Sequence, residues 1–186
     1  LAKGLSKQVL IEKLNKFNFF TSNFSQLVQD VDGNVLQSGS GQLTVKKPNR
    51  VHWNTLQPDE SLLVSNGETL WFFDPFVEEA RAYQLQDVIS NTPILLLTTD
   101  DKKLWDNYRV IKINQTSFMI NAIDENSQVK SLTLNFYKDL LSSLVIVDAT
   151  GQISTITLTN LDSSNEPDAQ LFEFILPEGI YLDDQR

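Results

Sequence analysis

The sequence predicts a mainly β protein, a curled antiparallel sheet or barrel that is partly covered by helices. Turn signals recur so closely along the chain that only short antiparallel strands fit between them. About eleven such strands are expected against one longer helix and two short ones, too many for one flat sheet. Three helices cannot cover both faces, so we expect them on the concave side.

An amphipathic helix is predicted at the N-terminus, over about 3–17. Apolar residues recur there at helical spacing with lysines and a glutamate between them; they are Leu5, Val9, Leu10, Leu14 and Phe17. A long hairpin follows, with arms over 20–31 and 35–46 around the turn Asp32-Gly33-Asn34.

A meander of short strands is predicted next, over 50–56, 62–64, 69–73 and 79–84. The strand run then breaks at about 86–99, where Pro93 is placed as a first helical residue between two short helices. Strands are expected again over 108–114, 117–122, 129–137, 143–147 and 153–159, and in the tail over 171–175. In 129–137, Leu132, Leu134 and Phe136 alternate with polar residues, which indicates one dry face and one wet face.

Composition limits the classes of function. A chain of 186 residues with 41% hydrophobic residues suits one domain, 1–186, with a real core. The net charge of -9 argues against nucleic acid as a partner, because such a protein needs a basic face. No apolar run approaches the ~20 residues that span a bilayer, so no stable membrane insertion is expected.

Catalytic chemistry is not supported by any motif. Cysteine is absent, and the one histidine, His52, is interpreted as a solvent-side strand residue that alternates away from Val51 and Trp53. The run Asp30 to Asn34 lacks the ligand spacing of a calcium loop and is better explained as a hairpin turn. Adjacent acidic pairs are typical of solvated turns. We therefore expect neither an enzyme, nor a metal site, nor a cofactor.

A surplus of apolar residues remains, and it allows two interpretations. Leu10, Leu14 and Phe17 on the first helix, with 94–97 beside Pro93, offer more apolar surface than a short cover needs. They either pack permanently against Trp53 and Trp71 as a core or line a cavity. The pattern alone favours the core.

Four stretches resemble the LolA family, the periplasmic carriers of outer-membrane lipoproteins in Gram-negative bacteria. They are VKKPNRVHW, QPDESLLVSNGETLWFFDPFVEEA, NTPILLL and the terminal DDQR. The resemblance runs along nearly the whole chain and is densest over 57–80. It implies an unclosed barrel of about eleven antiparallel strands under a lid of three helices, which encloses a hydrophobic cavity for acyl chains.

The resemblance also implies partners and sites. The carrier would be a periplasmic monomer that receives lipoproteins from the inner-membrane LolCDE transporter, through its LolC subunit, and passes them to LolB. The tail over about 165–186 would be a C-terminal extension. Acyl chains would contact Leu10, Leu14, Phe17, Val51, Trp53, Leu63, Trp71, Ile94 and Leu97, and lid closure would involve Lys47, Leu97 and Thr98.

One position departs from the family pattern. Where the family typically has an arginine before the proline of this block, the chain has Lys47. Lysine donates three hydrogen bonds but lacks the planar fork that grips several carbonyls, so the closed state is expected to be held differently. Two rivals to the carrier remain at this point: a carrier of another hydrophobic small molecule or lipid, and a structural module with a filled core.

Overall fold

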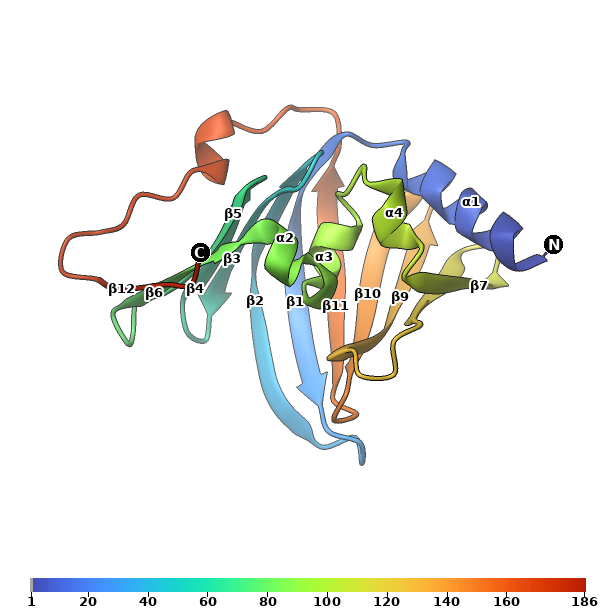
Figure 1. Ribbon diagram of the computed structural model, residues 1–186, viewed down its shortest axis with the longest axis horizontal. Helices are drawn as coiled ribbons and strands as arrows, with labels where there is room; N and C mark the ends of the chain where they lie inside the picture. Colours follow the sequence, from blue (N-terminus) through green and yellow to red (C-terminus); the bar gives the residue numbers. More distant parts are fainter. Residues whose placement is uncertain (1) are drawn as a thin grey trace. The chain divides into compact units, whose positions relative to one another are not determined.

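A computed structural model describes residues 2–186, with side chains described from residue 4 onward. In the described chain, twelve strands form one hydrogen-bonded sheet in the order β12-β6-β5-β4-β3-β2-β1-β11-β10-β9-β8-β7 (Figure 1). Because β12 and β7 stand at its two ends, the sheet is open. The predicted mainly β class with an unclosed sheet is confirmed.

The elements have the following bounds. The strands are β1 Phe19–Gln29, β2 Val35–Lys46, β3 Arg50–Gln57, β4 Ser61–Asn66, β5 Thr69–Asp74, β6 Glu79–Gln84, β7 Tyr108–Asn114, β8 Ser117–Ala122, β9 Val129–Tyr137, β10 Leu140–Asp148, β11 Ile153–Asp162 and β12 Tyr181–Asp184. The helices are α1 Ala2–Leu14, α2 Leu85–Val88, η1 Ile89–Asn91, α3 Pro93–Leu96, α4 Lys102–Trp105 and η2 Ala169–Phe172. Every helix of the described chain falls short of the length and hydropathy that crossing a bilayer requires.

The contacts divide the chain into two units, each of which is described by itself. Unit 1 comprises Leu1–Phe17, Ser25–Ser38 and Asp101–Thr159. Unit 2 comprises Asn18–Phe24, Gly39–Asp100 and Asn160–Arg186. The single domain expected from composition stays a prediction.

Unit 1 has its core on one face of β7 to β10. The predicted alternation in β9 is confirmed, since Leu132, Leu134 and Phe136 are all buried. On the opposite face the Asn135 side chain accepts a hydrogen bond from Ser117 at 2.7 Å and donates one to Ser143 at 2.8 Å. This polar row joins three neighbouring strands, so the dry and wet faces of the sheet are separated as alternation requires.

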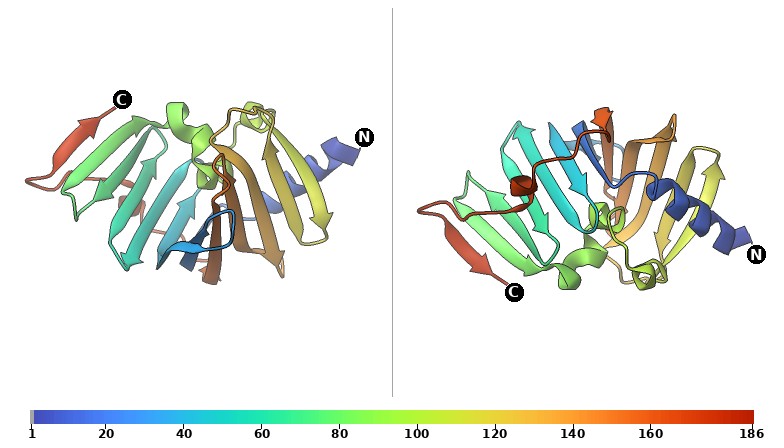
Figure 2. Two further views of the ribbon diagram at one scale, coloured as in Figure 1. Left: turned by 90° about the horizontal axis from the view of Figure 1, so that it is seen from below. Right: turned by 90° about the horizontal axis from the view of Figure 1, so that it is seen from above.

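Unit 2 consists of the meander β3 to β6 with segments on both of its sides. Figures 1 and 2 show α2 and α3 on one side of these strands, and the C-terminal segment with η2 on the other. The Asn66 side chain accepts hydrogen bonds from the amides of Glu68 and Thr69, which fixes the β4–β5 hairpin. The strands therefore present two apolar faces, each covered by a different part of the chain.

Several predicted elements differ from the observed ones. The first helix ends at Leu14, so Phe17 lies beyond it. The strand expected over 171–175 is wrong: Asp168 accepts a hydrogen bond from the amide of Gln170 and begins the 3-10 turn η2. Asp101 caps α4 in the same way, by accepting from Lys103, and this helix was not predicted.

The twelfth strand is a further correction. β12 pairs with β6 in parallel, so the sheet is not purely antiparallel. The pairing places Tyr181 beside Glu79 and Asp184 beside Ala82. Without β12, β6 would be an edge strand, so the last residues of the chain protect that edge.

Candidate functional site

An apolar face runs across β2, β3 and β4. Val51 and Trp53 share it, as their spacing predicts, because Val51 pairs with Val45 and Trp53 pairs with both Leu43 and Leu63. Leu43, Val45 and Val51 are fully buried, and Trp53 and Leu63 are half-buried. We call this surface the Val51 face. It brings three of the predicted cavity residues, Val51, Trp53 and Leu63, together.

Trp71 lies on the opposite face. It pairs with Val64, which pairs with His52, and residues directly opposite each other point to the same side of a sheet. We call this second surface the Trp71 face. The register therefore separates Trp71 from Val51, Trp53 and Leu63. The sequence alone did not decide which face Trp71 shares, because apolar residues fall on both faces of 70–73.

The C-terminal segment covers the Trp71 face. The Phe174 ring lies 5.1 Å from the Trp71 ring and 5.7 Å from the Phe73 ring, measured between centroids. The Arg186 guanidinium sits 4.9 Å from the centre of Trp71, where the negative face of the indole attracts a cation. Phe172 is buried beside β3 and β4. In this structure the Trp71 face is therefore covered by the chain itself.

His52 belongs to this covered face, which corrects its predicted solvent-side position. It pairs with Thr44 and Val64, both of which are buried, and is itself half-buried. Burial lowers the pKa of its imidazole, because desolvation disfavours the charged form. Among the described residues no group of three or more His, Cys, Asp or Glu side chains could hold a metal ion.

The segment around α3 carries the second apolar group. Pro93 stands at the start of α3, as predicted, and Ile94, Leu95, Leu96 and Leu97 are all buried. Such a run is buried all round, unlike an amphipathic surface helix with one exposed side. Ile94 and Leu97, two predicted cavity residues, therefore belong to the same buried stretch.

The end of α3 is joined to the β2–β3 turn. The amide of Asn49 donates a hydrogen bond to the carbonyl of Thr98 at 3.1 Å. Thr98 is fully buried, and its hydroxyl donates to the carbonyl of Leu95 at 2.8 Å. Two predicted closure residues, Leu97 and Thr98, thus lie at a contact between helix and sheet. Sequence reasoning missed Asn49, although the Pro-Asn pair marks a tight turn.

Lys47, the third predicted closure residue, lies in the same turn. Its amide donates to the carbonyl of Asn18 at 2.8 Å, and its own carbonyl accepts from the Arg50 guanidinium at 2.8 Å. Burial lowers the pKa of the Lys47 ammonium to about 8. A charge at this position is therefore costly, because the ammonium is partly removed from solvent.

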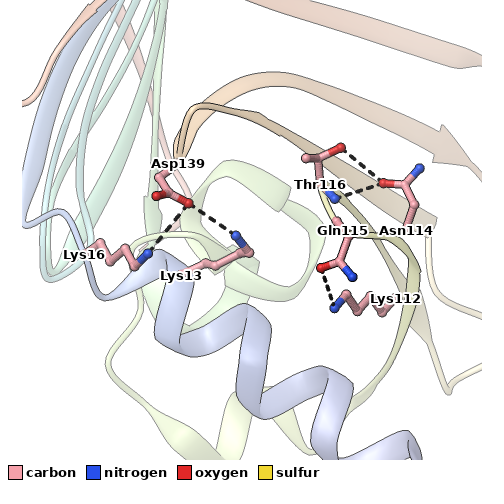
Figure 3. Close-up of polar contacts among 7 residues, drawn as sticks. All are labelled: Lys13, Lys16, Lys112, Asn114, Gln115, Thr116 and Asp139. Atoms are coloured by element: carbon pink, nitrogen blue, oxygen red, sulfur yellow. Dashed lines mark hydrogen bonds and ion pairs between the residues drawn. The ribbon is translucent and has the colours of Figure 1, made fainter.

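The remaining predicted residues lie on or just after α1, in unit 1. Leu10 and Leu14 are buried, and Phe17 is half-buried beyond the helix end. Polar contacts fasten the helix: Lys13 and Lys16 both approach the Asp139 carboxylate, at 3.5 and 3.7 Å (Figure 3). The predicted cavity residues thus do not form one group: three belong to unit 1 and six to unit 2, where Trp71 lies on the opposite face from Val51, Trp53 and Leu63. The enclosed cavity itself stays a prediction.

Comparison with known proteins decides the family. The family model described as outer membrane lipoprotein carrier protein LolA matches residues 15–175. The chain belongs to the LolA family. An outer-membrane lipoprotein carrier protein of Photobacterium profundum is 38% identical over 181 residues, covering 97% of this chain and 90% of that protein. One from Psychromonas ingrahamii is 36% identical over 187 residues, covering 100% and 91%.

Solved structures agree on the fold of this LolA family member. A LolA superfamily protein from Nitrosomonas europaea has a TM-score of 0.54 at 13% identity, covering 90% of this chain and 97% of that one. An uncharacterized conserved protein from Thermus thermophilus has a TM-score of 0.57 at 10% identity, covering 97% and 99%. The LolA family is one of carriers and not of enzymes.

Proposed function

We propose that this LolA family member carries outer-membrane lipoproteins across the periplasm by their acyl chains, taking them from LolCDE and delivering them to LolB. The observation that carries the proposal is the Val51 face together with the fully buried run of α3. Both are apolar, as an acyl cargo requires, and among the described residues no cluster of His, Cys, Asp or Glu that could hold a metal ion accompanies them.

In unit 2 the acyl chains would contact Val51, Trp53, Leu63, Ile94 and Leu97. Leu10, Leu14 and Phe17, the other predicted acyl contacts, belong to unit 1. Trp71 is left out, because its face is filled by Phe174 and Arg186. In this proposal α2 and α3 belong to the predicted three-helix lid, and the closing contacts lie at Lys47, Leu97 and Thr98.

A lid is needed because complete burial would prevent release. Burying acyl chains contributes ~0.8 kcal/mol per methylene, so two or three long chains would contribute tens of kcal/mol. Non-covalent affinities saturate at roughly 18 to 21 kcal/mol, and a carrier near that limit could not let go. Partial burial, offset by the work of opening the lid, keeps binding weak enough for transfer.

The test compares two neighbouring residues of β4 that face opposite ways. Leu63 pairs with Trp53 on the Val51 face, whereas Leu62 pairs with Phe73 on the Trp71 face, and both are half-buried. A carboxylate at either position costs stability, but only the one at Leu63 would enter the acyl site. Leu63→Glu should therefore abolish the release of a labelled lipoprotein from spheroplasts and its delivery to LolB, while Leu62→Glu should retain both.

Circular dichroism first establishes that both variants are folded at the assay temperature. Equal loss in two folded variants would contradict the assignment of the Val51 face. Failure of the unaltered chain to release any lipoprotein from spheroplasts would contradict the carrier function itself.

A further inference from the structure

Asn49 connects three parts of unit 2 at the point where α3 meets the sheet. Its amide donates to the carbonyl of Thr98 at 3.1 Å, and its own carbonyl accepts from the Ser65 hydroxyl at 2.6 Å. Ser65 is fully buried in β4. The backbone of Asn49 has a φ of 60°, in the left-handed region that asparagine tolerates better than most residues.

The side chain of Asn49 is the exception in this otherwise paired junction. Its Oδ1 is buried and has no hydrogen-bond partner, and among the described residues it is the one buried side-chain atom in that state. Buried carbonyl oxygens are normally paired, and an orphan carries the cost of its lost hydration. Asn49 therefore has two opposite effects at this junction: its backbone amide bonds to Thr98, while its unpaired side-chain oxygen disfavours the docked arrangement.

The element held by this junction has little stability of its own. α2, η1 and α3 are three or four residues long, and none of them has a side-chain hydrogen bond at its N-cap. Such short helices depend on tertiary contacts, here the burial of Ile94 to Leu97 and the bond from Asn49 to Thr98. A cost at the junction therefore raises the fraction of time for which this segment is undocked.

We infer that Asn49 is a positioning residue that weakens the docking of the α3 segment, because its Oδ1 is buried without a partner when the segment is docked and reaches water when the segment lifts. This inference rests on the proposed function, in which the segment is a lid, and assigns the balance between its two states to one side chain. Two parts of Asn49 act in opposite directions. Its backbone amide makes the hydrogen bond to Thr98, and its side-chain amide oxygen weakens the docking of the segment.

The test measures hydrogen exchange at the backbone amides of 94–98 in the purified, cargo-free chain. Asn49→Gly keeps the backbone bond and the left-handed φ but removes the orphan oxygen. It should slow exchange in 94–98 about tenfold, since an unpaired buried acceptor is worth about one order of magnitude in an equilibrium. Asn49→Asp keeps the shape and tolerates the same φ but adds a charge, so exchange should become faster at neutral pH.

Asn160 provides a matched control. It is a second asparagine with a positive φ, 55°, and its side chain is exposed. Asn160→Gly makes the same backbone change without an orphan oxygen, and exchange in 94–98 should equal that of the unaltered chain. Uptake of the apolar dye N-phenyl-1-naphthylamine should slow in Asn49→Gly and accelerate in Asn49→Asp.

Unchanged or faster exchange in Asn49→Gly would overturn the inference, because it would mean that Oδ1 stabilises the docked state, for example through a bound water. Equal exchange rates in Asn49→Asp and the unaltered chain would also overturn the inference. Asn49 would then only shape the β2–β3 turn. Exchange in a cargo-free chain does not depend on what is carried, so failure of lipoprotein transfer would leave this result intact.

Discussion

At the scale of single residues, the β2–β3 turn holds the groups on which docking of α3 depends. Lys47 lies in this turn, and burial lowers the pKa of its ammonium to about 8. An arginine in that place would stay charged at every accessible pH, because a guanidinium does not lose its proton in proteins. Lysine therefore gives this chain a pH dependence that arginine would not.

The direction of that dependence follows from linkage. The folded chain binds the Lys47 proton less tightly than the unfolded chain does, so the desolvation cost is fully present below about pH 8 and disappears as the pH rises toward 10.5. Lys47→Met, which lacks the charge, should be more stable at pH 7 by about 1 kcal/mol, since water screens part of the shift. The advantage should vanish by pH 10.5. Urea unfolding of both proteins from pH 7 to 10.5 measures the difference, and a constant gap across that range would contradict the prediction.

The sheet face of a residue was predictable from the sequence where apolar and polar residues alternate, and not where apolar residues run together. Val51 and Trp53 could be placed on one face because a polar residue separates them. Trp71 sits in a run of four apolar residues, whose parity only the pairing with Val64 reveals. The orphan oxygen of Asn49 depends on neighbours from β4 and α3 and has no sequence signal.

At the scale of elements, the C-terminal segment shows why a correct periodicity can still give a wrong element. Residues 171–175 alternate as a strand would, and Phe172 and Phe174 do turn toward the same sheet. They lie across the Trp71 face and not in the hydrogen-bonded plane, because β12 already pairs with β6. Alternation of side chains indicates which residues face the core. To be a strand, the segment must also pair with a sheet edge that no other strand occupies.

This segment should act as a structural strap with a measurable share of stability. Phe174→Ala should lower the free energy of unfolding by about 2 kcal/mol, because it removes ring contacts with Trp71 and Phe73 from a half-buried site. Ile175 is the control: it is the next residue, also apolar, and 84% exposed. Ile175→Ala should change stability by less than about 0.5 kcal/mol. Equal effects in urea unfolding would show that the rings contribute nothing specific.

At the scale of the whole molecule, the mainly β fold was predictable because turn signals cut the chain into short strands with local pairing. The signals at Asn66-Gly67 and Asp32-Gly33-Asn34 fix neighbouring hairpins without any knowledge of distant contacts. The pairing of β12 with β6 joins residues about a hundred positions apart, and the sequence carries no local mark of it. The features that the sequence did not predict, such as this strand pairing, are thus those that depend on contacts between residues far apart in the chain.

The same scale gives the test that separates a lipid carrier from a filled core. If acyl chains enter the Val51 face as proposed, each added methylene of a fluorescent fatty acid contributes ~0.8 kcal/mol, so Kd should fall about fourfold per methylene. The fall should stop at the chain length that fills the apolar surface, because further methylenes remain in water. Leu63→Glu should raise Kd for every chain length, and Leu62→Glu, on the covered Trp71 face, should leave the series unchanged. A Kd independent of chain length in fluorescence titrations would show that these residues form a closed core.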